Sequence, residues 1–162
     1  MNLPNTSQIH IRHRGTAIVE TNAGIVIVEE SNGVYNLPGG GVHQGESTEA
    51  ATIRELREET GLEAVSTQFL FDHWGRLHSV DDRQRQNQHA VFLIEAIGTP
   101  QPNDGIVAIR FYRPGDDVII GQSAGQIIEK YLTLKHPVVK YSTKTVSTGN
   151  EKPGFWVQHH LN

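Results

Sequence analysis

The sequence contains no cysteine among its 162 residues. This absence excludes disulfide bonds and zinc–thiolate sites, and it removes any indication of a secreted disulfide scaffold. Long apolar runs are also missing, because no stretch approaches the roughly 18 consecutive apolar residues of a membrane-spanning helix. The first ten residues, MNLPNTSQIH, lack the basic and then apolar pattern of a signal peptide. We therefore expect a soluble, cytoplasmic protein without a membrane partner.

An excess of positive charge is also missing. The chain has 14 Lys and Arg residues against 18 Asp and Glu residues, which gives a formal net charge of −4. Long nucleic acids favour proteins with a basic surface, so we do not expect one as a partner. The composition is compatible with a small phosphate-bearing substrate that arrives with its own metal ions.

The length indicates one ordinary domain with a proper core. We expect this domain to occupy residues 1–137, with the first few residues loose. Residues 138–162 alternate between short apolar pairs and polar loop residues, which predicts a C-terminal extension in the form of a packed arm or a flexible tail. A homodimer would give this extension a role.

Apolar runs separated by turn residues predict strands on both sides of a helix. The strand candidates are residues 8–20, 25–29, 34–37, 64–73, 89–97 and 106–112, and a second helix is expected over 123–134. Residues 37–41 (LPGGG) are expected to form a loop with bare backbone, and the polar residues 74–88 a long connection. Strands on both sides of a helix indicate an α/β fold with a mixed sheet.

The chemistry is concentrated between Gly40 and Leu62. Three acids, Glu55, Glu58 and Glu59, are spaced i, i+3, i+4, which places them within an arc of about 100° on a helix. That helix is expected over about Thr48 to Thr60. Ser47 or Thr48 can cap its start and Gly61 its end. The opposite face can be buried, and it carries Ala50, Ile53, Leu56 and Thr60.

This clustering of acids is locally unfavourable. Like charges at i, i+4 repel by about 0.2–0.5 kcal/mol, and acids near the end of a helix oppose its dipole. A cation bound between the carboxylates would reverse that penalty. Hard, oxygen-preferring ions such as Mg²⁺ or Mn²⁺ fit an all-carboxylate set. The alternative is a solvated face on which Arg54 and Arg57 offset the acids.

The spacing of these residues resembles the Nudix box. Every signature position is matched in this chain, by Gly40, Glu46, Arg54-Glu55-Leu56, Glu58-Glu59 and Gly61-Leu62. The resemblance covers 23 contiguous residues, and it implies an α/β/α sandwich with the box helix packed on a sheet. It also implies that Glu55, Glu58 and Glu59 are the metal ligands, with the Gly40 carbonyl as a plausible fourth.

The resemblance also suggests roles for neighbouring residues. Arg54 lies one turn before Glu58 and is expected to form an ion pair that orients that carboxylate, although it could contact substrate instead. Glu46 could hydrogen-bond the preceding loop or assist a metal, and we favour the structural role. Glu58, Glu55 and Arg54 are the residues we assign to catalysis.

The catalytic base is left open by the motif. Glu58 could hold metal and also take a proton. Glu95 and Asp104 lie outside the box, in the later region where an acid completes the site in many Nudix proteins, and Asp104 is the closer positional match. No substrate-binding residue is assigned. Several arginines could meet phosphate, although ordinary surface positions explain most of them: Arg12, Arg14, Arg76, Arg83 and Arg85.

These observations predict a Mg²⁺-dependent hydrolase that cleaves a phosphoanhydride bond in a nucleoside diphosphate linked to another moiety. A nucleoside triphosphate or related nucleotide is the favoured substrate. The alternative is a non-catalytic Nudix-fold module that senses a nucleotide, although the intact set of acids argues against it. Capped RNA is a third possibility, and the mildly acidic composition counts against it. Residues 77–80 carry no proline or tyrosine of the kind associated with ADP-ribose or dinucleoside polyphosphate hydrolases.

Overall fold

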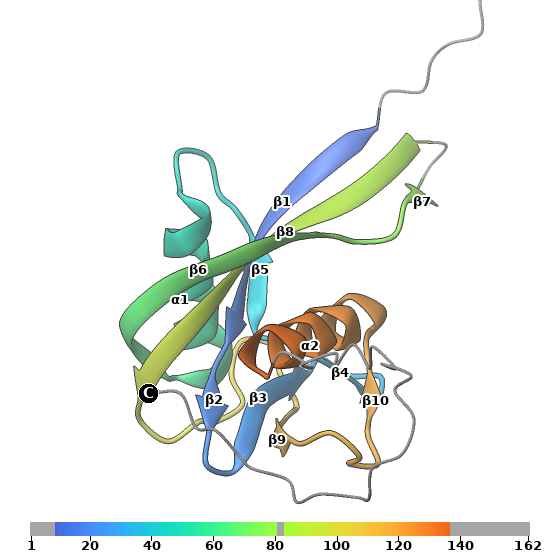
Figure 1. Ribbon diagram of the computed structural model, residues 1–162. Coiled ribbons are helices and arrows are strands. Elements are labelled where there is room, and N and C mark those ends of the chain that lie inside the picture. The colour runs from blue at the N-terminus through green and yellow to red at the C-terminus, as the bar shows by residue number, and fades with distance from the viewer. Residues whose placement is uncertain (1–8, 81–82, 137–162) are drawn as a thin grey trace, which may run out of the picture.

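The computed structural model describes residues 9–80 and 83–136, which form two five-stranded sheets and two helices (Figure 1). The predicted extension 138–162 lies outside the described residues. No helix in the described part is long and apolar enough to cross a membrane. The strands are β1 (His10–Ile18), β2 (Glu20–Thr21), β3 (Gly24–Glu29), β4 (Val34–Asn36), β5 (Gly39–Gly41), β6 (Glu63–Trp74), β7 (His78–Val80), β8 (Arg83–Ile97), β9 (Ala108–Tyr112) and β10 (Ile119–Ile120); the helices are α1 (Thr48–Thr60) and α2 (Gln122–Lys135).

Both sheets are mixed, as the sequence predicts. The first has the order β5-β1-β8-β6, with β7 pairing on β8. Within it β1 runs parallel to β8, whereas β5 and β6 are antiparallel to their neighbours. The second has the order β10-β4-β3-β2 with β9 paired to β3, and only the β10–β4 pair is parallel.

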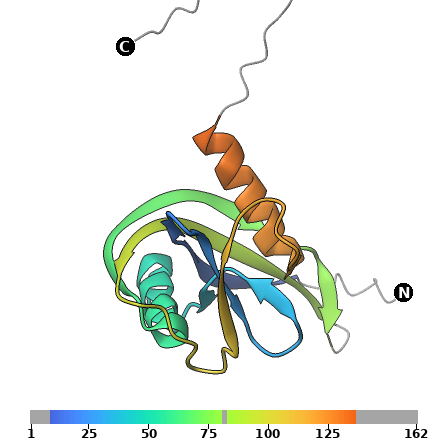
Figure 2. The ribbon, with the colours of Figure 1, turned by 90° about the horizontal axis from the view of Figure 1, so that it is seen from below.

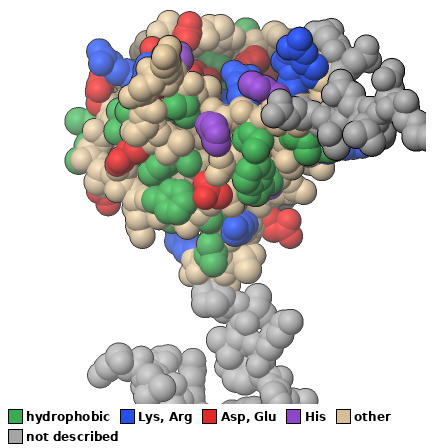
Figure 3. Space-filling view, turned by 90° about the horizontal axis from the view of Figure 1, so that it is seen from above, with side chains coloured by type: hydrophobic (Ala, Val, Ile, Leu, Met, Phe, Trp, Pro, Cys, Tyr) green, Lys and Arg blue, Asp and Glu red, His purple; other side chains and the backbone are tan. Residues whose placement is uncertain are grey.

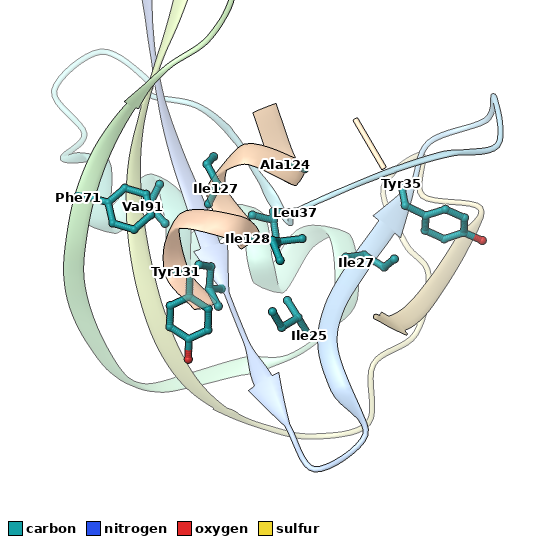
Figure 4. Packing of buried hydrophobic residues seen from close by; sticks show 11 residues of the cluster. Ile25, Ile27, Tyr35, Leu37, Phe71, Val91, Ala124, Ile127, Ile128 and Tyr131 are labelled. Atoms are coloured by element: carbon teal, nitrogen blue, oxygen red, sulfur yellow. The ribbon is translucent and has the colours of Figure 1, made fainter. Parts of the chain in front are cut away.

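Alternate residues of β1 and β3 face two different helices. Ile18 of β1 and Ile27 of β3 pack with α2 in one apolar cluster, whose side chains converge in Figure 4. Ala17 and Val26, each one position earlier, pack with Leu56 of α1 in a second cluster. The strands therefore lie between the two helices (Figure 2), and the expected α/β/α arrangement is confirmed.

Helix α1 begins and ends where the sequence predicts. The Ser47 side chain accepts a hydrogen bond from the Ala50 N–H, which caps the start of the helix. Gly61 has φ 70° and donates its N–H to the Arg57 carbonyl, the left-handed ending that glycine adopts without strain. Helix α2 extends one residue beyond the predicted range at each end.

Two segments expected to be loops are strands instead. Residues 39–41 form β5, with Gly40 opposite Gly15 of β1. Residues 78–80 and 83–88 form β7 and the first part of β8, so the expected polar connection is wrong over most of its length. These segments form strands although they carry few apolar side chains. The reason is that backbone hydrogen bonds to neighbouring strands hold them, and such bonds depend little on side-chain polarity.

The buried face of α1 is also rotated from the expected one. Leu56 and Thr60 are fully buried, as predicted. Ile53 is 37% exposed, whereas Glu59 is only 8% exposed. The reason is that α1 packs against β5 as well as β1 and β6, so one of its acids faces the protein.

Candidate active site

The guanidinium of Arg54 is the centre of a polar network on α1. Its Nη1 donates to Glu55 at 2.8 Å and to Glu58 at 3.0 Å. Its Nε and Nη2 donate to the two carboxylate oxygens of Glu46 at 2.8 and 3.0 Å. Nη2 also donates to the Gly41 carbonyl at 3.0 Å. The predicted ion pair with Glu58 is therefore present, and it is one contact of several.

Glu46 joins this network to the loop before α1. One of its oxygens also accepts the His43 N–H at 2.9 Å. The hydrogen bonds from Arg54, and then the one from His43, lower the pKa of Glu46 to about 2. These contacts are those of a residue that fixes the loop and orients Arg54, which agrees with the favoured structural role.

Glu59 is the buried carboxylate of the three. It accepts a hydrogen bond from the Gly39 N–H at 3.0 Å. Burial raises the pKa of Glu59 to about 7; the hydrogen bond from Gly39 and the charge of Arg14 oppose that rise, and the charge of Glu55 adds to it. A second positive charge beside Glu59 would therefore be favourable.

The three glycines of β5 let the acids of α1 approach the backbone closely. A Cβ on Gly40 would overlap the Glu55 carboxylate. Gly39 has φ 150°, and a Cβ there would lie 2.9 Å from the Thr16 Cα. Gly39 therefore requires glycine, whereas a side chain at Gly40 would displace Glu55, so β5 is a bare backbone surface against which Glu55 and Glu59 lie.

The donor chemistry around β5 fits a hard cation. The groups gathered there are carboxylates and backbone carbonyls, which Mg²⁺ and Mn²⁺ prefer. Among residues 9–80 and 83–136, no three His, Asp or Glu side chains are close enough together to hold a metal as they stand. Arg54 occupies one oxygen of Glu55 and one of Glu58. A cation would therefore compete with Arg54 for these two carboxylates.

A pocket of about 310 Å³ opens beside Glu59, where the two sheets meet the start of α2. Leu37, Ala124 and Ile127 form its apolar wall. Its polar lining comes from both sheets, the loop after β3 and both helices, and it includes Arg14, Glu30, Asn36, Glu59, Asn87 and Gln122. An apolar pocket with a few convergent polar groups is the usual form of a small-molecule site.

Two polar groups in this pocket have an atom without a partner. The Nε of Arg14 and the Nε2 of His89 are buried and make no hydrogen bond within the described part of the chain. Arg14 donates from Nη2 to the Gly39 carbonyl at 2.9 Å, and Thr16 Oγ1 lies 3.0 Å from His89 Nδ1. Burial, and then the charge of Arg14, lowers the pKa of His89 to about 4. Unpaired buried polar atoms of this kind favour a polar ligand.

The two candidate acids outside the box are not in this network. Glu95 is exposed on β8 and accepts a hydrogen bond from Ser66. Asp104 is exposed in a left-handed turn, with φ 48°, and makes no hydrogen bond or ion pair with the α1 acids in the described structure. Its neighbour Asn103 donates to the Glu59 backbone carbonyl at 3.1 Å, so this loop lies at the end of α1.

Sequence reasoning missed most of the pocket residues. The sequence puts Asn87 within the expected connection and gives His89 no role beyond its place in the expected strand 89–97. Arg14 was one of five undifferentiated arginines. The available signal was the alternation of Arg14, Thr16 and Ile18 along the expected strand, since alternate residues of a strand share a face.

A family model described as the NUDIX domain matches residues 11–126. The ADP-ribose pyrophosphatase of Methanocaldococcus jannaschii is 33% identical over 87 residues, which are 50% of this chain and 48% of that protein. The RNA pyrophosphohydrolase of Nitrobacter winogradskyi is 34% identical over 109 residues, which are 59% of this chain and 64% of that one. The chain thus spans less than two thirds of the length of these curated relatives.

Solved structures show the same fold. A putative nudix hydrolase family member from Chromobacterium violaceum has a TM-score of 0.66 and 34% identity, covering 80% of this chain and 82% of that one. The NUDIX domain of Shewanella oneidensis NrtR, solved with ADP ribose, has a TM-score of 0.60, covering 79% of this chain and 89% of that chain. At 16% identity the second likeness concerns the fold alone.

Proposed function

We propose, from the premise that this chain belongs to the Nudix family, that it is a divalent-metal-dependent hydrolase of a nucleoside triphosphate or related nucleotide. The reaction is cleavage of a phosphoanhydride bond in a nucleoside diphosphate linked to another moiety. One observation carries the proposal: the acidic face of α1 lies against a strand of bare glycine backbone at the edge of a polar pocket.

Glu55, Glu58 and Glu59 would hold the metal, with the Gly40 carbonyl as a further ligand. A carbonyl in a strand ladder keeps a second lone pair, so pairing with β1 does not prevent this role. When bound, Mg²⁺ supplies neutralisation of phosphate charge and activation of water. The buried Glu59 stays close to the pocket because Gly39 holds its carboxylate.

Glu58 is the preferred candidate for the catalytic base. Its side chain is 44% exposed, the most of the carboxylates that Arg54 contacts, so a water molecule can reach it. Its single hydrogen bond to Arg54 leaves the second oxygen available to accept a proton. Arg54 restrains Glu58 and Glu55 together and so fixes their relative orientation.

The pocket would hold the nucleoside, and Arg14 would contact a phosphate. The unpartnered Arg14 Nε supports this role, since a guanidinium binds phosphate oxygens with several donors in one plane. Names of the relatives include both an ADP-ribose pyrophosphatase and an RNA pyrophosphohydrolase. Both names specify hydrolysis of a pyrophosphate, and they differ in the molecule named, which is ADP-ribose in one and RNA in the other.

The test is Mg²⁺-dependent turnover across ordinary and oxidised nucleoside triphosphates, ADP-ribose, NADH, dinucleoside polyphosphates and nucleotide sugars, with products identified. Glu58→Gln should lower kcat by at least about 100-fold, in the range expected for loss of a general base. Glu49→Gln is the matched control, because Glu49 lies in the first turn of the same helix and contacts Thr67.

A nucleotide-sensing module is the second candidate. It is favoured by one observation, that Arg54 already neutralises part of the acidic face without a metal. Tight nucleotide binding without cleavage of any panel member, in Mg²⁺ or Mn²⁺, would replace the hydrolase proposal with this one.

A further inference from the structure

Beyond the pocket, β1 and β8 continue away from the body of the protein as a ribbon, with β7 along its other edge (Figure 1). The parallel register places His10 beside Arg85, Arg12 beside Asn87 and Arg14 beside His89. On the other side of β8, His78 pairs with Arg85. Directly paired residues share a face of a sheet, and so do residues two apart along a strand.

One face of this ribbon therefore carries a row of basic side chains and no acid at the paired positions. We call it the cationic stripe, and it consists of His10, Arg12, Arg14, His78 and Arg85. It is the face that leads into the pocket, because Thr16 continues the same alternation along β1 and lines the pocket. Figure 3 shows basic and histidine side chains lying next to one another on the surface seen from above.

The arginines of the stripe differ from the two arginines of α1. Arg54 and Arg57 pair with carboxylates. In the described residues, Arg12, Arg14 and Arg85 have no carboxylate at ion-pair distance. Burial, and then the charge of Arg12, lowers the pKa of Arg14, and the charges of Glu59, Glu55 and Glu30 oppose that fall. Like charges held side by side on one face of a sheet are destabilising, so an anion along this face would be favourable.

The stripe lies close to two acids of α1, at two different hollows. Arg14 lines the pocket with Glu59. Arg12 lies over β5, where a Cβ on Gly41 would be 3.1 Å from the Arg12 Nη2. Arg12 and Glu55 also line a second hollow, of about 730 Å³. An anionic ligand that enters the pocket and reaches the acids of α1 could therefore extend along the stripe and stay in contact with basic side chains over its whole length.

We propose that the cationic stripe binds the sugar–phosphate backbone of a single-stranded oligonucleotide whose 5′-terminal nucleoside, with its phosphates, enters the pocket. The inference rests on the proposed function, since the pocket would hold the end that is cleaved. From Arg14 to His10 is four strand steps, or about 13 Å. A stacked strand at about 3.4 Å per nucleotide covers that length with about four nucleotides.

The recognition would be of phosphates and would not depend on base sequence. No aromatic side chain belongs to the stripe; Trp74 pairs with Gln88, whose side chain points to the opposite face from Asn87 and His89. Without aromatic platforms the bases are not stacked on protein, and phosphate contacts alone carry no sequence information. The net charge of −4 would limit binding to a short strand, because it opposes long-range attraction of a long polyanion.

Binding can be measured without turnover. Oligoribonucleotides of one to six nucleotides, with a 5′ triphosphate and a 3′ fluorophore, are titrated with the full chain in EDTA and followed by anisotropy. Affinity should rise up to about four nucleotides and then level off. Arg12→Ala and Arg85→Ala should each weaken tetranucleotide binding several-fold. Each should also reduce the salt slope by about 0.7 for every phosphate that the variant no longer neutralises.

Arg57→Ala is the control variant, because Arg57 is an exposed arginine that pairs with Glu63 on another face. Affinity that does not depend on length, or an equal loss in Arg57→Ala, would overturn the proposal. Circular dichroism and the urea midpoint establish that each variant is folded. A deoxyribonucleotide strand should bind within about threefold of the RNA strand, and its failure to bind would overturn recognition through phosphate.

Turnover then separates this proposal from the one on which it rests. The ratio of kcat/KM for a 5′-triphosphorylated tetranucleotide to that for a nucleoside triphosphate should fall in Arg12→Ala and Arg85→Ala. If the enzyme cleaves mononucleotides but shows no preference for longer strands, either in turnover or in the binding assay with EDTA, the proposal for the stripe is refuted and the hydrolase proposal stands. If the protein cleaves no substrate and still binds tetranucleotides through Arg12 and Arg85, the hydrolase proposal is refuted and the proposal for the stripe stands.

Discussion

Replacement of Gly40 by alanine should separate the stability of this protein from its activity. The added Cβ would overlap the Glu55 carboxylate, which is the far end of a flexible side chain. Glu55 can move by rotating its χ angles, at a cost of about 0.5–1.5 kcal/mol. Alanine also restricts the unfolded chain, which offsets about 0.4–1 kcal/mol. We therefore expect the free energy of unfolding to change by less than about 1 kcal/mol.

Activity should respond much more strongly to the same change. If Glu55 holds the metal against β5, displacing its carboxylate by about 1 Å is expected to lower turnover by about 100-fold. Urea denaturation followed by circular dichroism gives the stability, and Mg²⁺-dependent turnover of the best substrate in the panel gives the activity. Affinity for Mn²⁺, measured by calorimetry, should fall in parallel with turnover.

Gly15→Ala supplies the contrast on the paired strand. Its Cβ would lie 2.5 Å from the Thr48 carbonyl and 2.7 Å from the Thr52 nitrogen, and these backbone atoms of α1 cannot rotate away. We expect a loss of at least about 1–3 kcal/mol in stability, the range for overpacking. The reasoning is refuted if Gly40→Ala retains full turnover and Mn²⁺ affinity, or if it destabilises the fold as much as Gly15→Ala.

Three further predictions concern the helix, the network and the pocket. Leu56→Ala should cost about 2–5 kcal/mol in the free energy of unfolding, because Leu56 is fully buried. Ile53→Ala should cost less than about 1 kcal/mol, because Ile53 is 37% exposed. Equal losses in urea denaturation would show that Ile53 is buried, as the sequence pattern predicts. Arg54→Lys should lower kcat while leaving the fold intact, because one ammonium cannot hold Glu46, Glu55 and Glu58 together; unchanged turnover would show that Arg54 does not orient the acids. His89 has a pKa of about 4 in the folded chain against 6.5 for the ordinary side chain, so the unfolded chain binds more protons between these values and stability should fall as the pH drops from about 6.5 to about 4. The loss is on the order of 3 kcal/mol, and His89→Gln should abolish that part of the pH dependence of the urea midpoint.

Local sequence determined the site helix closely. Ser47 and Gly61 fix the ends of α1 through contacts that span no more than four residues, so its bounds could be predicted without a fold. The spacing of Glu55, Glu58 and Glu59 placed the acids together for the same reason, since helical geometry is periodic. The ion pair between Arg54 and Glu58 is also a contact within one turn.

The sequence left undecided which side of that helix the protein would bury. Ile53 is more apolar than Glu59, yet Glu59 is buried because β5 lies against it and Gly39 satisfies its carboxylate. The partner that makes this burial tolerable is 20 residues away in the chain. A pattern of polarity along one segment contains no information about such a partner.

Strand pairing was the other property that only the tertiary structure decided. The glycines of β5 and the polar residues of β7 and early β8 form strands because β1 and β8 offer them backbone partners, some of them more than 70 residues distant in sequence. The same pairing brings Arg14, His89 and Asn87 into one pocket beside Glu59. The sequence thus determined the acidic face of α1 by short-range periodicity, whereas the pocket and the cationic stripe arise from long-range backbone hydrogen bonds that join segments without a shared local pattern.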